Sequence, residues 1–191
     1  MNIKQKQILD AAFDLFYTRG FHAVGINEII KAANVAKKTL YNHFSSKDDL
    51  IIATLTQHHE QIMQQLQQGL TFAVPGKDSL LIVFEVLDAW IQNQQTELPK
   101  FNGCYFNQAF SEFSAINEDI ASLCLKHKQS YKDIFTEHVN DFEDNQEKQQ
   151  LLIDLLVLLH EGSLSNSHVL TQKNSAQQAM RYIENVLRFK R

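Results

Sequence analysis

The sequence has few residues that break helices and few that can form cross-links. Only two prolines and six glycines occur, and Gly162 is the one glycine after Gly103. Because both residue types interrupt helices, their scarcity predicts long helices. The two cysteines, Cys104 and Cys124, are too few for a disulfide scaffold and are typical of a protein in a reducing compartment.

Long hydrophobic runs are also missing. The longest, residues 151–159, has nine residues and includes Asp154, whereas a membrane crossing needs about 20 apolar residues. The start of the chain carries Lys4, Lys6 and Asp10, unlike the apolar stretch of a signal peptide. Hydrophobic residues make up 44% and charged residues 21%, as in ordinary folded domains. We therefore expect a cytoplasmic protein with no membrane span.

Apolar residues recur at spacings of three and four, and strict apolar/polar alternation between tight turns is absent. This pattern predicts an all-α fold of about nine helices. The first helix should end at Gly20 and the second at Asn34, and Ser46 with Asp49 forms a capping-box-like start for a long helix. The remaining expected boundaries are 37–44, 47–68, 80–93, 104–113, 118–142, 147–170 and 175–189.

Charge divides the chain into a basic head and an acidic body. Residues 1–50 contain seven Lys or Arg and five Asp or Glu, while residues 51–191 contain eleven and seventeen. A polyanion would be attracted to the head and repelled by the body. We expect a DNA-binding domain over residues 1–50 and a second domain over residues 51–191.

Two short helices around the turn at Asn34 have the dimensions of a helix-turn-helix, whose second helix fits the major groove of DNA. In the second of these helices Leu40 and Phe44 lie four residues apart and can anchor it to a core. The other side chains then point outward and are of the types that contact phosphates and base edges. The alternative is an ordinary solvated helix.

Two stretches of the head match a known family densely. They are A-A-F-D-L-F-Y-T-R-G-F at 11–21 and V-A-K-K-T-L-Y-N-H-F-S-S-K-D-D-L at 35–50. The head resembles the DNA-binding domain of the tetracycline-repressor (TetR) family. The resemblance implies a bacterial transcriptional regulator, usually a repressor, in which a homodimer places two recognition helices in successive major grooves of a palindromic operator. It also implies that the body binds a small-molecule inducer.

The resemblance also assigns residues to DNA. Lys37, Lys38, Thr39 and Asn42 become candidates for base or phosphate contact, while Tyr41, His43 and Lys47 would anchor the DNA backbone, and Asn27 joins the set. The sequence departs from the family where Gly25 and Ala36 replace the usual hydroxyl caps of the second and third helices. Lys38 replaces a commonly small residue and should increase attraction to phosphate.

The body contains many aromatic residues, which fill a core or line an apolar ligand cavity. Cys124, His127 and Tyr131 share one helix face with two later polar residues, His138 and Asp141. Pairs of these could each be half of a metal site, but His127 and His138 are about 16 Å apart along a helix, and we expect neither a metal nor a cofactor. The candidate effector-pocket residues are Trp90, Tyr105, Phe106, Phe110, Cys124, His127 and Tyr131.

Cys104 follows Gly103 at an expected helix start, with Lys100 nearby, and both features favour the thiolate form. A redox- or electrophile-sensing repressor acting through Cys104 is therefore the alternative regulator. The simpler interpretation is a small buried hydrophobic residue.

The helix containing residues 151–159 is apolar nearly all round, so both of its sides must be covered. Small residues after it permit close helix approach, and the resemblance implies that the last two helices pair with their copies in a four-helix bundle. The candidate dimer-interface residues are Leu155, Leu159, Gly162, Ser163, Asn166, Ile183 and Leu187.

An enzyme is the rival class. The sequence contains no HExxH, G-x-S-x-G or G-x-G-x-x-G motif, so we expect no catalysis. A third class is an interaction module that kept the head fold without reading DNA, and the outward cationic and aromatic residues argue against it.

Overall fold

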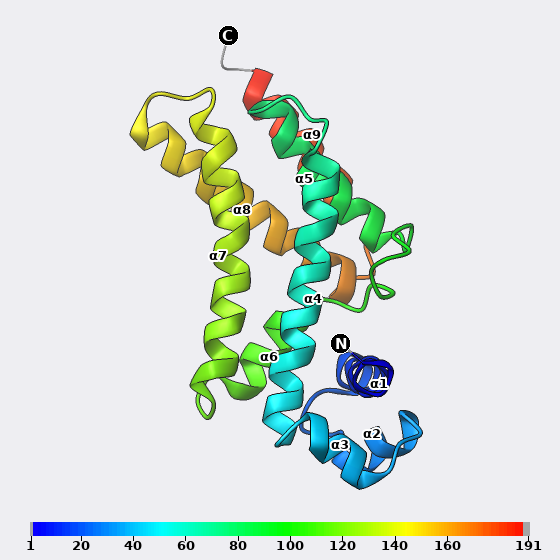
Figure 1. Ribbon diagram of the computed structural model, residues 1–191. Coiled ribbons are helices and arrows are strands. Elements are labelled where there is room, and N and C mark those ends of the chain that lie inside the picture. Colours follow the sequence, from blue (N-terminus) through cyan, green and yellow to red (C-terminus); the bar gives the residue numbers. More distant parts are fainter. Residues whose placement is uncertain (1, 189–191) are drawn as a thin grey trace. The chain divides into compact units, whose positions relative to one another are not determined.

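The computed structural model describes residues 2–188, and over these residues it consists of nine α-helices without strands (Figure 1). The all-α prediction is confirmed. The helices are α1 (Ile3–Arg19), α2 (Ile26–Ala32), α3 (Lys37–His43), α4 (Lys47–Leu70), α5 (Lys77–Ile91), α6 (Tyr105–Phe113), α7 (Glu118–Asn140), α8 (Gln146–Val169) and α9 (Ser175–Arg188).

Two compact units divide the chain. The first unit comprises the residues up to Glu60 together with Tyr105–His127, and the second comprises Gln61–Cys104 together with the residues from Lys128 onward. This division differs from the predicted one at residue 50, because α6 and the start of α7 belong to the same compact unit as the head. The functional boundary at residue 50 stays a prediction.

In the first unit, α1, α2 and α3 pack on one another around a fully buried apolar core. Phe16 from α1 and Phe21 from the following turn lie with their ring centroids 5.2 Å apart. Ile29 on α2 and Leu40 on α3 close the same core. Short helices of seven residues are marginal alone, so this packing is what holds them.

In the second unit, α9 packs against both α5 and α8. The Gln177 amide donates to the Asp88 carboxylate at 3.0 Å, and the Gln92 amide donates to the carbonyl oxygen of Lys173 at 2.7 Å. Phe84 on α5 stacks on Phe135 of α7 with centroids 6.0 Å apart. One side-chain amide therefore joins α5 to α9, a second joins the end of α5 to the loop before α9, and apolar packing joins α5 to α7.

The predicted helix ends agree well with the structure. Gly20 has φ 89° and its N–H donates to the Phe16 carbonyl, while Asn34 has φ 50°, the left-handed conformation that asparagine tolerates. The Ser46 hydroxyl accepts from the Asp49 N–H at 3.0 Å, as the capping-box-like pattern predicts. Gly25 and Ala36 give their helices no side-chain cap.

The largest boundary difference is at α5, which begins at Lys77 rather than at Leu80. Gly76, with φ 93°, makes the sharp turn into the helix, and the Leu80 N–H already donates to its carbonyl. Because the first helical residues Lys77 and Asp78 are polar, apolar periodicity alone missed this turn. No helix within residues 2–188 is both long enough and apolar enough to cross a membrane.

Candidate DNA-binding surface and cavities

The outward face of α3 carries the residues that the sequence assigned to DNA. Leu40 is fully buried and Phe44, just beyond the helix, is almost so. Lys37 and Lys38 are exposed on the other side, and the Tyr41 ring is 44% exposed. The helix is thus anchored by its apolar residues and presents its cations and its phenol to solvent.

The other candidates follow the same arrangement. Asn27 at the start of α2 and Asn42 on α3 are exposed, while Thr39, His43 and Lys47 are half-buried. Lys47 begins α4, and its ammonium lies 5.9 Å from the centre of the Phe16 ring, within cation–π distance. All eight candidates therefore belong to one compact unit and keep polar groups in reach of solvent.

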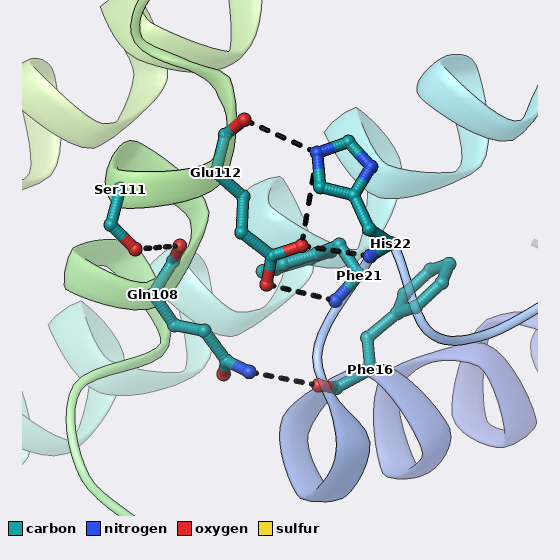
Figure 2. A network of polar contacts seen from close by, with 6 residues as sticks. All are labelled: Phe16, Phe21, His22, Gln108, Ser111 and Glu112. Atoms are coloured by element: carbon teal, nitrogen blue, oxygen red, sulfur yellow. Dashed lines mark hydrogen bonds and ion pairs between the residues drawn. The ribbon is translucent and has the colours of Figure 1, made fainter.

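Residues of α6 bind the turn between α1 and α2. The Glu112 carboxylate accepts from the backbone N–H of Phe21 at 3.1 Å and from that of His22 at 2.7 Å (Figure 2). The His22 ring nitrogen Nε2 lies 3.3 Å from the Glu112 carbonyl oxygen. A single side chain thus satisfies two backbone donors that no helix satisfies.

Gln108, one turn earlier on α6, extends this contact to the end of α1. Its amide donates to the Phe16 carbonyl oxygen at 3.4 Å (Figure 2). A Cβ at Gly20 would lie 3.2 Å from the Glu112 carboxylate, so a side chain there would crowd the contact. We call Gln108, Glu112 and the backbone of Phe21 and His22 the turn clamp. The turn clamp holds the segment that leads from α1 into α2, the first helix of the helix-turn-helix.

Aromatic rings fill the space below the turn clamp. Tyr105 of α6 is fully buried and its ring lies 4.9 Å from that of Phe21. The hydroxyls of Tyr105 and Thr54 share a hydrogen bond of 2.9 Å. Burial raises the pKa of the Tyr105 hydroxyl far above its ordinary value, so it stays a neutral phenol. This ring is core of the first unit.

A small cavity of about 110 Å³ also lies in the first unit. In its wall the Nδ1 atoms of His59 and His127 are 3.0 Å apart, and the His127 ring stacks on Phe106 with centroids 3.6 Å apart. Burial, with a smaller effect of Lys126, lowers the pKa of His59. The lining residues are Leu55, Thr56, His59, Glu60, Phe106, Leu123, Lys126 and His127.

The second unit contains a larger cavity, of about 250 Å³. Burial lowers the pKa of His160, whose side chain is nine-tenths or more buried, so its imidazole is neutral at neutral pH. Its ring lies 4.0 Å from that of Tyr131, centre to centre, and burial raises the pKa of Tyr131. The lining residues are Lys128, Tyr131, Phe135, Val157, His160 and Glu161.

An ion pair forms part of the wall of this second cavity. Lys128 Nζ lies 2.8 Å from both carboxylate oxygens of Glu161 and donates to Cys104 Sγ at 3.3 Å. Burial would raise the pKa of Glu161, but its contacts with His160 and Lys128 outweigh this and lower it to about 2. For Lys128, burial favours a lower pKa, yet the Cys104 and Glu161 groups raise it. The pair is therefore charged and internally compensated.

The structure distributes the predicted effector-pocket residues over several places. Tyr131 lines the larger cavity, whereas Phe106 and His127 line the smaller one in the other unit. Cys124 is buried and Phe110 is partly exposed. Trp90 packs on Phe101 and donates its ring N–H to the Pro99 carbonyl at 2.8 Å. Among the described residues, no cluster of three or more His, Cys, Asp or Glu side chains is arranged to hold a metal ion.

The predicted dimer-interface residues differ in their exposure to solvent. Ser163, Ile183 and Leu187 are buried within the second unit, and the Ser163 hydroxyl donates to the Leu159 carbonyl at 2.7 Å. Leu155, Leu159 and Gly162 are half-buried and Asn166 is exposed. The accessible members of the set all lie on α8.

Comparison with known proteins agrees with this geometry. Residues 8–54 match the family model described as bacterial regulatory proteins, tetR family. The crystal structure of a TetR-family transcriptional regulator from Streptomyces coelicolor superposes with a TM-score of 0.87 and 28% identity, covering 97% of this chain and 94% of that one. The family-model match places the helix-turn-helix head of the chain in the TetR family. Its helix-turn-helix is the DNA-binding part of a transcriptional regulator.

Two HTH-type regulators show how far the sequence similarity extends. The transcriptional activator FasR of Mycolicibacterium smegmatis is 34% identical over 90 residues, which cover 47% of this chain and less than half, 41%, of that activator. The uncharacterized regulator YxaF of Bacillus subtilis is 24% identical over 171 residues, covering 89% of this chain and 86% of YxaF.

Sequence analysis missed several residues that the structure brings into these sites. Glu112 and Gln108 lie some ninety positions from the turn they bind, and nothing local in the sequence marks that pairing. Lys128, His160 and Glu161 come from α7 and α8 and meet only in three dimensions. A histidine inside the apolar pattern of α8 was the one available signal, since burial of a polar ring requires an explanation.

Proposed function

We propose that this TetR-family protein is a repressor that binds a palindromic operator as a homodimer and is released when a small molecule enters the cavity of the second unit. The observation that carries this proposal is the face of α3, where Leu40 and Phe44 point inward and Lys37, Lys38 and Asn42 point outward. Cations and amides at such positions supply phosphate and base-edge contacts.

The DNA-binding residues have distinct expected roles that one assay separates. Tyr41→Ala and Lys47→Ala should weaken binding to all sequences alike, because phosphate contacts carry no sequence information. Asn42→Ala should relax specificity, with a loss of about 1–3 kcal/mol on the preferred sequence only. The purified chain is titrated with DNA enriched from a random pool and with scrambled DNA, at two salt concentrations.

Lys173→Ala is the matched control, since this exposed lysine lies in the second unit, outside the proposed DNA-binding surface. Failure to enrich any sequence, or unchanged binding in all three test variants, contradicts the proposal. The direction of regulation is read separately, by whether a reporter downstream of the enriched sequence is silenced or induced, because FasR is an activator by name.

The homodimer is proposed on an apolar stripe along α8. Leu151 is 65% and Leu158 70% exposed, and a Cβ added at Gly162 would meet nothing within 4 Å. Exposed leucines on one helix, next to a glycine with open space, fit a second copy of the same helix. The accessible candidates Leu155 and Leu159 extend this stripe.

Leu158→Glu should convert the dimer to a monomer and weaken operator binding at least about a hundredfold, because two half-sites are then no longer bound together. Analytical ultracentrifugation measures the mass. Ile116→Glu is the control, since Ile116 is exposed to a similar degree, 68%, but lies in the first unit. A dimer that survives Leu158→Glu contradicts the α8 interface.

A thiol sensor is the second candidate mode of release. The observation that favours it is the Lys128 ammonium, which donates a hydrogen bond to Cys104 Sγ at 3.3 Å and so places a charged group beside the sulfur. Mild peroxide or electrophile treatment of the native protein followed by mass spectrometry tests it. An unmodified Cys104, or a Cys104→Ser protein that still loses DNA under the same treatment, excludes this mode.

A further inference from the structure

The cavity of the second unit limits the size of what it can hold. Its volume is about 250 Å³, and its apolar wall is formed by Tyr131, Phe135 and Val157. An apolar protein cavity of about 150 Å³ is large enough for benzene. The space therefore suits a single aromatic ring with a short substituent.

The charges in the wall limit the charge of the ligand. Both carboxylate oxygens of Glu161 are within 2.8 Å of the Lys128 ammonium, so each charge has its partner within the wall. A charged ligand would lose its hydration without gaining an uncompensated counter-charge. The neutral His160 adds none. The ligand that fits is uncharged.

His160 supplies the polar contact. Its side chain is 2% exposed, and neither ring nitrogen has a hydrogen-bond partner among the described residues. Its Nδ1 lies 3.5 Å from Glu161 Oε1, too long for a hydrogen bond but close enough for the carboxylate to favour the proton on Nδ1. This tautomer leaves the lone pair of Nε2 as a buried acceptor without a donor, which is unfavourable.

We propose that the cavity binds a neutral, single-ring aromatic molecule that carries a hydroxyl, and that this hydroxyl donates a hydrogen bond to His160 Nε2. The inference rests on the proposed function, because such a molecule would be the effector. The ring nitrogens of His160 have almost no accessible surface. A neighbouring side chain therefore has to shift when the ligand binds, and Tyr131, whose ring lies 4.0 Å from that of His160 centre to centre, is a candidate.

The test compares three probes of similar shape on the full-length protein by isothermal titration calorimetry: 4-ethylphenol, 4-ethyltoluene and 4-ethylbenzoate. A purely apolar cavity prefers 4-ethyltoluene, because the phenol loses more hydration on binding. The expected result is 4-ethylphenol binding about tenfold more tightly than 4-ethyltoluene, with 4-ethylbenzoate weakest. Equal binding of the first two, or tightest binding of 4-ethylbenzoate, overturns the proposal.

Substitutions at His160 assign the preference to one atom. His160→Leu should abolish the preference for the phenol while 4-ethyltoluene still binds, and His160→Gln, which retains an acceptor, should keep part of it. A phenol preference that persists in a folded His160→Leu protein overturns the assignment. If His160→Leu does not fold, the three probes are compared on the unaltered protein and on the His160→Gln variant. These two comparisons still show whether His160 causes the preference for the phenol.

An experiment on the DNA complex distinguishes failure of the proposed ligand class from failure of the proposed function. The three probes are added to the complex of the protein with its enriched operator. Release by 4-ethylphenol alone supports both proposals. The expected calorimetric order without any release supports the ligand class and contradicts ligand-driven release, while the reverse order overturns the ligand class even if DNA binding is specific.

Discussion

The two compact units differ in where their polar side chains lie: on the outer surface in the first unit and around a cavity in the second. The first unit keeps its candidate DNA-contacting groups on the outer face of short helices, and the half-buried Glu112 supports the turn before α2. The second unit turns His160, Lys128 and Glu161 toward a shared cavity. Outward groups can act without precise mutual placement, whereas inward groups must be satisfied by one another or by a ligand.

Stability is distributed differently as a consequence. Two of the helices of the first unit are only seven residues long, and their N-cap residues, Gly25 and Ala36, offer no side-chain acceptor, so this unit depends on packing and on the turn clamp. The helices that lie wholly in the second unit, α5, α8 and α9, have 15, 24 and 14 residues, and α9 is packed on two neighbours. The DNA-reading part should therefore be the more sensitive to removal of a single acceptor.

The largest effect is expected from Glu112→Ala, which removes the acceptor of two backbone donors. It should lower the free energy of unfolding by about 1–3 kcal/mol and weaken operator binding, because the turn before α2 loses its support. Urea unfolding measures the stability. Amide hydrogen exchange at Phe21 and His22 locates the loss, and protection of these two amides should fall first.

Glu118→Ala is the matched control for the turn clamp. Glu118 is exposed in the first turn of α7 in the same unit, so its removal should change stability by no more than about 0.5 kcal/mol. Equal effects of the two substitutions on stability would mean that the first unit does not depend on the turn clamp. The two units would then not differ in this respect.

The second prediction concerns pH and the second unit. Burial holds the pKa of His160 below its ordinary value of 6.5 in the folded chain. The unfolded chain then binds more protons as pH falls through 6.5, so the free energy of unfolding decreases from pH 7.5 to 5.5. His160→Leu should reduce this dependence in urea unfolding at a series of pH values, and the part that remains includes the contribution of His59. Val157→Ala, which changes the same cavity without a titrating group, should lower stability without changing the slope.

The smallest effect is expected from Ala36→Ser, which supplies the missing cap of α3. Because Ala36 already has the extended conformation of a capping residue, with φ −74° and ψ 150°, the hydroxyl should add about 0.5–2 kcal/mol. Thermal unfolding measures the gain. Ala32→Ser, at an exposed position within α2, should give no gain because serine is a weaker helix former than alanine.

The helices and the exposed face of α3 could be predicted from the sequence because both depend on local patterns. Leu40 and Phe44 at a spacing of four fix which side of α3 is buried, and the exposed side, which we propose contacts DNA, follows by exclusion. Gly20 and Asn34 mark their turns because they adopt positive φ with little or no strain.

The cavity and the turn clamp could not be predicted because they depend on contacts between distant segments. The aromatic pattern indicated Tyr105 as a pocket residue, but an aromatic ring on a helix face looks the same in a core as beside a ligand. Likewise, Glu112 is one acidic residue among many until its distance to the Phe21 amide is known.

The His59–His127 contact in the first unit has a consequence for proton placement. With their Nδ1 atoms 3.0 Å apart, only one of the two facing nitrogens can carry a hydrogen, so the two imidazoles must be opposite tautomers. One ring is protonated on Nδ1 and the other on Nε2. The tautomer of His59 on α4 therefore determines the tautomer of His127 on α7. If both rings were charged, two N–H groups would face each other, so the contact can persist only while at least one imidazole is neutral.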